Sequence, residues 1–422
     1  MRFLYCFLFY LALPLVFIRM LWRSRRLPDY RKRWGERLGF YPAHLKLKDS
    51  IWIHAVSVGE TIAATPLIRA LQARYPASPF IITTMTPTGA ARVKASFGDT
   101  VQHAYLPYDL PGAVRRFLNT VQPRMGIIVE TELWPTLLTA AHARQIPLCL
   151  LNARLSSQSA RGYRCIAPLM RNVLRRFTFI AAHGQADAER FLELGAIPDQ
   201  ITVTGNIKFD LTLPEDLLVK SEMLRKQWGD NRFIWVAAST HEGEEEIVLA
   251  AHHEIRKRYP QALLLLVPRH PDRFEKIAKL CEQQFYTVRR SSGGTPNLDT
   301  AVFLGDTMGE LLLFYGVADV AFVAGSLIPQ GGHNVLEAAA LHKPILTGPH
   351  VFNFTEINAL LSAANALLQV HDAAALAEQL MLLIENEQWR TQLGLRAAEV
   401  MAANRGALAK QLTLVTQVLD AS

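Results

Sequence analysis

Apolar and polar positions follow one another in blocks along most of the chain. After residue 50, short continuous apolar runs recur, and the first series comprises IWIHAV, PFIITTM, MGIIVE, IPLCLL, FIAAH and ITVTG. Helix-like periodicity separates these runs, as in residues 66–75 and 135–144. Apolar runs without alternation are typical of strands buried on both faces. Strands that alternate with helices therefore predict a parallel, doubly wound α/β layer.

The rhythm is interrupted at Gly205, where GNIKFDLTLPEDL brings glycine, proline and charge together. A second series then runs through FIWVAAST, ALLLLVP, TAVFLGD, VAFVAG, PILTG and ALLQV, and helical periodicity follows from Ala373. This predicts two similar α/β domains with a ligand cleft beyond the carboxyl ends of their strands. We expect a first domain at 51–205, a linker at 206–225, and a second domain at 226–422 that includes the terminal helices.

The N-terminal segment has a different pattern. Phe3 to Ile18 contains no charge, and Arg19 interrupts before Met20-Leu21-Trp22 continues the apolar character. As a helix, residues 3–22 would be about 30 Å long, which matches the core of a bilayer. We therefore expect a membrane-anchor helix at 1–22. A short interfacial anchor that does not cross is an alternative. A cleaved signal peptide is a weaker one, since no small-residue cleavage site follows.

The net charge of +8 is concentrated beside this apolar segment. Residues 1–37 contain nine Lys/Arg and two Asp/Glu, so the rest of the chain carries only about +1. A nucleic-acid enzyme would spread basic patches over its folded domains, whereas a local basic segment favours an anionic membrane surface. Its position after the apolar segment predicts that the remainder lies in the cytoplasm. The basic residues of this juxtamembrane segment, 23–50, include Arg23, Arg25, Arg26, Arg31, Lys32, Arg33 and Arg37.

Carboxylates follow two of the apolar runs. Ser57-Val58-Gly59-Glu60 comes after the first run, and we expect Gly59 to allow a tight turn and Glu60 to face the cleft. The alternative is that Glu60 is only a first-turn carboxylate that complements a helix dipole. Pro66 also allows a later start of the helix, at that residue, with Thr65 as its cap. Glu130 and Glu132 end another run, where charge is costly unless it is paired. Strand alternation allows at most one of these two to face the cleft.

Other candidate residues suit an anionic ligand. Lys208 lies in the expected linker, where it could reach a phosphate or carboxylate, although a solvated lysine is the simpler interpretation. Gly331-Gly332 precede His333 and a helix-like segment at 334–337, which predicts a phosphate site at a helix N-terminus. Arg269 follows another apolar run and offers its guanidinium to an anion. Gly309-Glu310-Leu311 marks a further helix start.

Several common motifs are missing from the sequence. It contains no Walker P-loop, no GxGxxG after the first run, no HExxH and no DxD. The four cysteines form no CxxC pair, which argues against a zinc site and suits a reducing compartment. We therefore expect no metal and no cofactor, so that arginine, lysine and backbone dipoles would neutralise a bound phosphate.

A series of longer motifs carries a family resemblance. In chain order they are SVGE (57–60), TMTPTG (84–89), YLPYDLP (105–111), ETELWP (130–135), NARLS (152–156), GNIKFD (205–210), STHEGEE (239–245), VPRHP (267–271), GDTMGEL (305–311), GGHNVLEAAA (331–340) and GPHVFNF (348–354). Together they closely resemble the 3-deoxy-D-manno-octulosonic acid (Kdo) transferases of Gram-negative bacteria. The resemblance runs from the apolar segment to about Phe354 and is looser beyond.

The resemblance implies a GT-B glycosyltransferase, with two Rossmann-like domains, a cleft between them and an N-terminal anchor helix. It implies metal-independent, inverting transfer of Kdo from CMP-Kdo to a lipid A precursor. Glu60 would be the general base, with Ser57 and Gly59 beside it on the acceptor side, and Glu130 and Lys208 would stabilise the transition state. The implied donor-binding residues are Pro268, Arg269, Gly309, Glu310, Leu311, Gly331, Gly332, Asn334, Val335, Leu336 and Glu337.

The expected partners are thus CMP-Kdo, a lipid A precursor and inner-membrane lipid, with no nucleic acid. The catalytic domains are expected on the cytoplasmic side of the bacterial inner membrane. Two alternatives are a sugar-nucleotide epimerase of the same fold, and a catalytically inactive, membrane-tethered binding protein.

Overall fold

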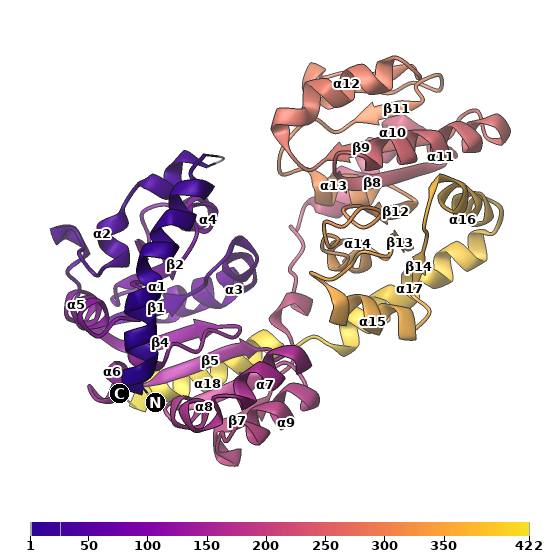
Figure 1. Ribbon diagram of the computed structural model, residues 1–422. Helices are drawn as coiled ribbons and strands as arrows, with labels where there is room; N and C mark the ends of the chain where they lie inside the picture. The colour runs from indigo at the N-terminus through magenta and orange to yellow at the C-terminus, as the bar shows by residue number, and fades with distance from the viewer. Residues whose placement is uncertain (1, 26, 422) are drawn as a thin grey trace. The chain divides into compact units, whose positions relative to one another are not determined.

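The chain folds into two compact units, each of which is described separately. The computed structural model describes residues 2–25 and 27–421, apart from the Arg2 side chain. The first unit comprises Met1–Asp210 and Arg405–Ser422, and the second comprises Leu211–Asn404 (Figure 1). Met1, Arg26 and Ser422 belong to the expected anchor, basic segment and second domain, and they lie outside the described residues.

A seven-stranded sheet forms the centre of the first unit. Its strand order is β3-β2-β1-β4-β5-β6-β7, and every pairing is parallel. The central strand β1 is buried at all five positions and pairs with β2 on one side and β4 on the other. The strands are β1 (Ser50–His54), β2 (Phe80–Thr84), β3 (Gln102–Tyr105), β4 (Pro123–Val129), β5 (Leu148–Ala153), β6 (Phe179–Ala182) and β7 (Ile201–Val203).

Helices cover both faces of this sheet because alternate side chains of each buried strand point to opposite faces. Trp52 lies in the core on one face and contacts Phe117 edge-on at 5.2 Å, whereas Ile51 and Ile53 lie in the core on the other. The helices of the first unit are α1 (Arg2–Arg23), α2 (Trp34–Arg37), α3 (Val58–Arg74), α4 (Pro87–Phe97), α5 (Pro111–Val121), α6 (Pro135–His142), α7 (Ser157–Arg164), α8 (Ala167–Leu174), α9 (Gln185–Glu193) and α18 (Ala407–Ala421).

The second unit repeats the plan with another seven-stranded parallel sheet. Its order is β10-β11-β9-β8-β12-β13-β14. These strands are β8 (Ile234–Thr240), β9 (Leu263–Pro268), β10 (Thr287–Arg289), β11 (Val302–Leu304), β12 (Val320–Val323), β13 (Ile345–Thr347) and β14 (Leu367–Gln369). The helices are α10 (Leu217–Trp228), α11 (Glu244–Arg258), α12 (Phe274–Glu282), α13 (Leu311–Val317), α14 (Leu336–Ala340), α15 (Thr355–Ala363), α16 (Ala373–Glu385) and α17 (Glu387–Ala403).

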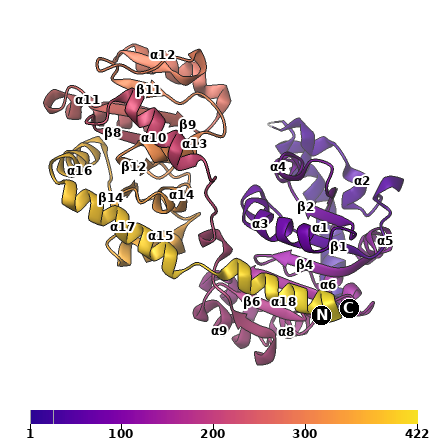
Figure 2. The same ribbon diagram turned by 180° about the vertical axis from the view of Figure 1, so that it is seen from behind.

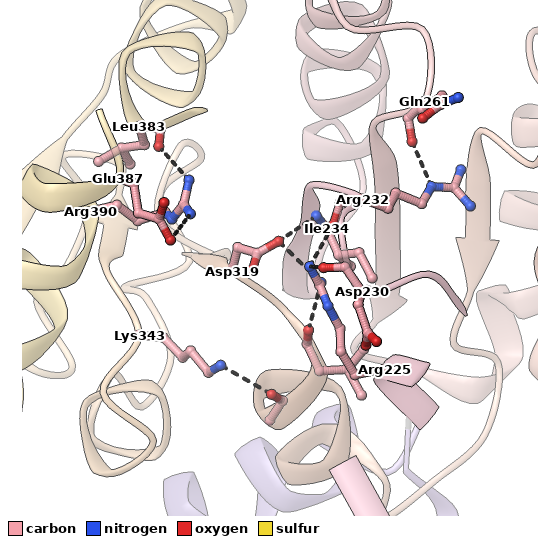
Figure 3. A network of polar contacts seen from close by, with 12 residues as sticks. Arg225, Asp230, Arg232, Ile234, Gln261, Asp319, Lys343, Leu383, Glu387 and Arg390 are labelled. Carbon is pink, nitrogen blue, oxygen red and sulfur yellow. Dashed lines mark hydrogen bonds and ion pairs between the residues drawn. The ribbon is translucent and has the colours of Figure 1, made fainter. Parts of the chain in front are cut away.

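A polar network fixes α10 to this second sheet (Figure 3). The Asp319 carboxylate, just before β12, accepts hydrogen bonds from the Arg225 guanidinium at 3.1 Å and from the Ile234 N–H at 2.8 Å. Arg225 also donates to the Asp230 carbonyl at 3.1 Å. One partly buried carboxylate thus ties a helix to the starts of two adjacent strands.

The two-domain α/β prediction is confirmed, but the expected boundaries need correction. The division falls after Asp210, and α10 occupies part of the expected linker 206–225. The last helix, α18, belongs to the first unit and not to the second (Figure 2). The reason is burial, because Val415 and Leu419 lie in the core beside α3 and α4. The Asp210 carboxylate also accepts hydrogen bonds from the Gly406 and Leu408 N–H groups, each at 2.6 Å.

We predict that Leu419→Ala destabilises the first unit selectively. The side chain is only 3% exposed, so its truncation should lower the free energy of unfolding of that unit by about 2–4 kcal/mol. Native-state hydrogen exchange would show faster exchange of β1 and β4 amides and unchanged exchange of β8. Exposed Gln417, changed to alanine, is the matched control on the same helix. Faster exchange in β8 would contradict the assignment of α18.

Candidate functional site

Glu60 lies in the first turn of α3, directly after β1. Ser57 caps this helix, and its hydroxyl donates to Glu60 Oε1 at 2.9 Å. The Val56 N–H donates to Glu60 Oε2 at 2.7 Å. The helix begins at Val58, so the expected start at Pro66 is wrong, and Pro66 lies inside the helix. These bonds hold the carboxylate at the strand–helix junction and leave a lone pair on each oxygen available.

The environment of Glu60 favours its protonated form. Burial, together with the negative charge of Glu130, raises the pKa of Glu60 to about 7. Burial also raises the pKa of Glu132 to about 7. A carboxyl that titrates near neutral pH can accept a proton and release it again, which is the property of a general base.

Gly59 does not form the tight turn expected of it. It lies within α3, outside the set of glycines with positive φ, and a Cβ there would meet only Ser57 Oγ, at 3.9 Å. The chain instead bends at Ser57, directly before the helix. Nothing in the structure explains the choice of glycine at this position.

Glu130 and Lys208 form an ion pair in the first unit. Lys208 Nζ lies 3.0 Å from Glu130 Oε1, and each side chain is 26% exposed. Glu130 directly follows β4 and has a left-handed backbone with φ of 62°, which is uncommon for a residue other than glycine. Lys208 is therefore not a solvated linker lysine. It belongs to the first unit, close to the boundary at Asp210.

Two asparagines hold the backbone of the Lys208 loop. Asn152, just before the end of β5, accepts from the Ile207 N–H at 2.9 Å, and Asn206 accepts from the Lys208 N–H at 3.0 Å. Asn152 also has a positive φ of 51°. Neither asparagine was among the predicted site residues, although Asn152 begins the NARLS motif and Asn206 lies in GNIKFD. Both act on the backbone, so their role is visible only in three dimensions.

In the second unit, Arg269 follows β9 and has an exposed side chain. The backbone N–H of Arg269 donates to the Thr240 carbonyl at 3.0 Å, which holds the loop after β9 against the end of β8. Nearby Glu337 lies in the first turn of α14, where burial raises its pKa and the positive charge of Arg269 opposes that shift. Two of the predicted donor-binding residues, Arg269 and Glu337, therefore lie close enough for the charge of one to act on the other.

The predicted glycine-rich segment has the backbone that glycine permits. Gly331 and Gly332 have φ of 98° and 74°, and a Cβ on Gly331 would come within 2.4 Å of Asn353 Nδ2. The helix that follows is shorter than expected, with only five residues in α14. The Asn334 side chain accepts from the Leu336 N–H at 3.2 Å, and Val335 is the residue that precedes the helix. With so short a helix, the positive charge for an anion comes mainly from side chains.

The remaining predicted donor residues lie at the end of β9 and in the segment that follows β11. Pro268 is the last residue of β9, and Leu311 is the first residue of α13. Gly309 has a left-handed backbone with φ of 86°. Glu310 forms a two-oxygen ion pair with Arg290, whose shortest distance is 2.7 Å. The Glu310 carboxylate is therefore already paired with the Arg290 guanidinium.

A histidine pair that the sequence did not reveal lies beside Arg269. The rings of His241 and His333 are stacked, with 5.1 Å between centroids, and their Nε2 atoms are 2.9 Å apart. Burial, together with the positive charge of Arg269, lowers the pKa of His241 to about 4 and that of His333 to about 3. Both rings are therefore neutral near pH 7, and one donates its N–H to the other.

Glu244, the first residue of α11, holds the backbone of the loop after β12. Its fully buried carboxylate accepts hydrogen bonds from the N–H groups of Gly325 at 2.7 Å, of Ser326 and Leu327 at 3.0 Å, and of His241 at 3.1 Å. The sequence signal for both His241 and Glu244 was the STHEGEE motif, whose last five residues follow β8 as SVGE follows β1. Only the structure distinguishes their roles.

Comparison with known proteins decides the family. A family model described as 3-deoxy-D-manno-octulosonic-acid transferase (kdotransferase) matches residues 32–211. The chain is also 46% identical, over 99% of both chains, to the 3-deoxy-D-manno-octulosonic acid transferase of Haemophilus influenzae. The chain belongs to the Kdo transferase family. It is therefore a glycosyltransferase, as its motifs predicted.

Solved structures agree with the predicted GT-B fold. The UDP-GlcNAc 2-epimerase of Neisseria meningitidis, solved with UDP-GlcNAc, has a TM-score of 0.56 at 18% identity and covers 88% of this chain and 100% of its own. Acinetobacter baumannii MurG has a TM-score of 0.55 at 12% identity, with 88% and 99% covered. At these identities the likeness shows the fold alone. The prediction of two Rossmann-like domains of the GT-B class is confirmed.

We predict that Glu130→Gln lowers the pKa of Glu60. The substitution removes a negative charge that raises this pKa and leaves the Lys208 ammonium without its partner, so both effects favour ionised Glu60. Carboxyl-carbon NMR of glutamate-labelled protein should show Glu60 titrating below about 7. Exposed Glu189, changed to glutamine, is the control and should leave the midpoint unchanged. An unchanged or raised midpoint in Glu130→Gln would disprove the coupling.

Proposed function

We propose that the protein transfers Kdo from CMP-Kdo to a lipid A precursor (lipid IVA) in lipopolysaccharide core biosynthesis, with inversion at the anomeric carbon. The observation that carries the proposal is the Glu60 carboxyl, which is fixed at the β1–α3 junction with a pKa raised to about 7. Membership of the Kdo transferase family supports the sugar that is transferred.

In the proposed reaction, Glu60 accepts the proton of the attacking acceptor hydroxyl. The hydroxyl oxygen forms a bond to the anomeric carbon of Kdo while the bond from that carbon to the phosphate oxygen breaks. The electron pair of the broken bond leaves with CMP, and the proton moves to a free lone pair on Glu60. Ser57 and the Val56 N–H keep the carboxylate oriented. A positioned base of this kind contributes about 10²–10⁴-fold to the rate.

Glu130 and Lys208 are proposed to stabilise the transition state. Positive charge develops at the anomeric carbon as the glycosidic bond breaks. A carboxylate such as that of Glu130 favours this charge, and the Lys208 ammonium favours the negative charge of the sugar acid or the departing phosphate. Their ion pair, at 3.0 Å, supports a preorganised arrangement in which neither side chain has to be ordered during the reaction.

The donor is proposed to bind to the second unit. Arg269, exposed beside Glu337, supplies positive charge for the single phosphate of CMP, and Glu337 accepts hydrogen bonds from ribose hydroxyls. Gly309, Gly331 and Gly332 allow the backbone to approach the nucleotide closely. Glu310 would act through its ion pair with Arg290. The other proposed donor-binding residues lie in the segments at the end of β9, after β11 and after β12. They are Pro268, Leu311, Asn334, Val335 and Leu336.

We further propose that no metal or cofactor takes part and that the protein works at the cytoplasmic face of the inner membrane. The departing phosphate monoester carries less charge than a diphosphate, so cationic side chains suffice to neutralise it. The apolar helix α1 supports membrane attachment, since its segment Phe3–Arg23 has a mean hydropathy of 2.1 and most of its large apolar side chains are exposed.

Glu60→Gln should abolish transfer and leave donor binding intact. The amide cannot accept the proton, so turnover should fall by about 10²–10⁴-fold, whereas CMP binding, measured calorimetrically, should not change. In the unchanged protein, kcat/KM should rise with pH through about 7, because only ionised Glu60 acts as the base.

Arg269→Ala is the converse variant and should weaken CMP binding while Glu60 remains intact. Near-normal turnover of Glu60→Gln would reject the assignment of the base. Mass spectrometry of the product, together with CMP release, separates transfer from the two alternatives. An epimerase would alter its nucleotide sugar without any lipid acceptor, and an inactive binding protein would release no CMP.

Excess EDTA should leave the transfer rate unchanged if the proposal of metal-free catalysis is right. The protein would be dialysed against chelator and assayed with and without added Mg²⁺, with initial CMP release as the measurement. A metal-dependent transferase run in parallel serves as the control for chelation. Recovery of lost activity by Mg²⁺ would contradict the proposal.

A further inference from the structure

One face of α1 is packed against the folded first unit along most of the length of the helix. The residues on this face recur at intervals of three and four, as expected for a single helical stripe. Six of them are partly buried and Met20 is 6% exposed. They are Tyr5, Cys6, Phe9, Leu13, Val16, Phe17 and Met20.

The contacts begin near the N-terminal end of the helix. The Tyr5 hydroxyl lies beside the Asp109 carboxylate, and Cys6 Sγ lies 3.5 Å from Thr136 Oγ1. Asp109 itself accepts hydrogen bonds from the Thr136 and Leu137 N–H groups, both at 2.8 Å, at the start of α6. The first turns of α1 are therefore fixed to a polar, hydrogen-bonded part of the unit.

The contacts continue to the other end of the helix. The Phe17 ring lies 5.1 Å from the Trp34 ring and 6.0 Å from the Tyr108 ring. Met20 Sδ accepts a hydrogen bond from the Tyr108 hydroxyl at 2.9 Å. Figure 1 shows α1 running along the first unit and not away from it. The helix is thus docked from Tyr5 to Met20.

The opposite face of α1 is exposed and almost entirely apolar. Its large side chains are between 46% and 85% exposed, and they are Phe3, Leu4, Phe7, Leu8, Tyr10, Leu11, Leu15, Ile18, Leu21 and Trp22. Exposed basic side chains lie on and just after the helix, at Arg19, Arg23, Arg25 and Arg31. A wide apolar stripe beside a group of cations matches the boundary between the acyl chains and the headgroups of an anionic bilayer.

Two of the basic residues expected to face the membrane are engaged elsewhere. Arg37 is buried, and its guanidinium donates to the Met85 carbonyl at 3.1 Å and lies over the Tyr105 ring. Arg33 forms an ion pair with Glu36 at 2.6 Å. The expected basic segment is therefore shorter than its sequence indicates, and the cations left for lipid are those nearest to α1.

The docked face conflicts with a helix that crosses the bilayer. At 22 residues α1 is about 33 Å long, so a spanning α1 would extend over the whole hydrocarbon core. Because the folded unit is attached from Tyr5 to Met20, it would have to enter that core with the helix. Hydrocarbon offers no partners for the polar surface of a folded domain.

We propose that α1 lies in the plane of one leaflet of an anionic bilayer, with its exposed apolar face in the acyl chains. The N-terminus then stays on the same side of the membrane as the folded units. This goes beyond the proposed localisation, because it distinguishes an in-plane helix from a spanning anchor. The in-plane orientation does not depend on transferase activity. Either the orientation or the proposed function can therefore be disproved while the other stands.

Substitutions on the exposed face test the lipid contact. The double variant Leu8→Asp/Leu15→Asp puts charge where acyl chains are expected without touching the docked face. In flotation with phosphatidylglycerol-containing vesicles, we expect binding at least about tenfold weaker than in the unchanged protein. Leu218→Asp is the matched control, since Leu218 is 59% exposed on α10, and it should float as the unchanged protein does. Unchanged flotation of the double variant would overturn the proposal.

Sidedness tests the in-plane orientation. The full-length chain with a protease-cleavable tag before Met1 would be reconstituted into sealed vesicles. Exposed Cys165, on the first unit, reports through an impermeant maleimide which side that unit occupies. We expect protease added outside to cleave the tag in the same fraction of molecules whose Cys165 is labelled. A tag protected in molecules with labelled Cys165 would show a spanning helix and reject the proposal. So would a protein that dimerises through this face and does not bind vesicles.

Discussion

When parallel strands are buried on both faces, only the residues at their ends can contact a ligand. This constraint determines where charged side chains gather in both units. In the first unit β1 and β4 are neighbouring central strands, so Glu60 and Glu130, which follow them, lie close together at the carboxyl ends of these strands. The loop after β7 brings Lys208 to the same end of the sheet, where it pairs with Glu130. The sheet thus gathers three charged side chains that are far apart in the chain, and the low-dielectric strand ends perturb the pKa of Glu60.

Two similar motifs show how local geometry separates a carboxylate that can accept a further hydrogen bond from one that cannot. SVGE follows β1, and HEGE, within STHEGEE, follows β8 in the second unit. Glu60 accepts two hydrogen bonds and stays partly exposed, so a lone pair remains available on each oxygen. Glu244 is fully buried and accepts four backbone N–H bonds, three from the loop after β12 and one from His241, so its carboxylate is occupied in holding these two loops. Family membership and fold do not distinguish these roles, whereas hydrogen-bond counts do.

Most of the fold was predictable because short continuous apolar runs that alternate with longer helix-like segments are typical of strands buried on both faces. All twelve predicted runs are strands, but β3 and β10 were missed because they are short, partly exposed edge strands with polar residues. The assignment of α18 also failed. Its helical pattern was clear, but periodicity does not say which sheet a helix covers, and that depends on the fit of Val415 and Leu419 into a distant core.

The sequence by itself determined the alternation of strands and helices, the family, the apolar character of residues 3–22 and the presence of acidic and basic residues at strand ends. These follow from local composition and order. Only the tertiary structure decided that Lys208 neutralises Glu130, that His241 stacks on His333, and that one face of α1 is occupied by protein. Each of these depends on residues far apart in the chain approaching within a few ångströms, and the packing of a whole unit sets that approach.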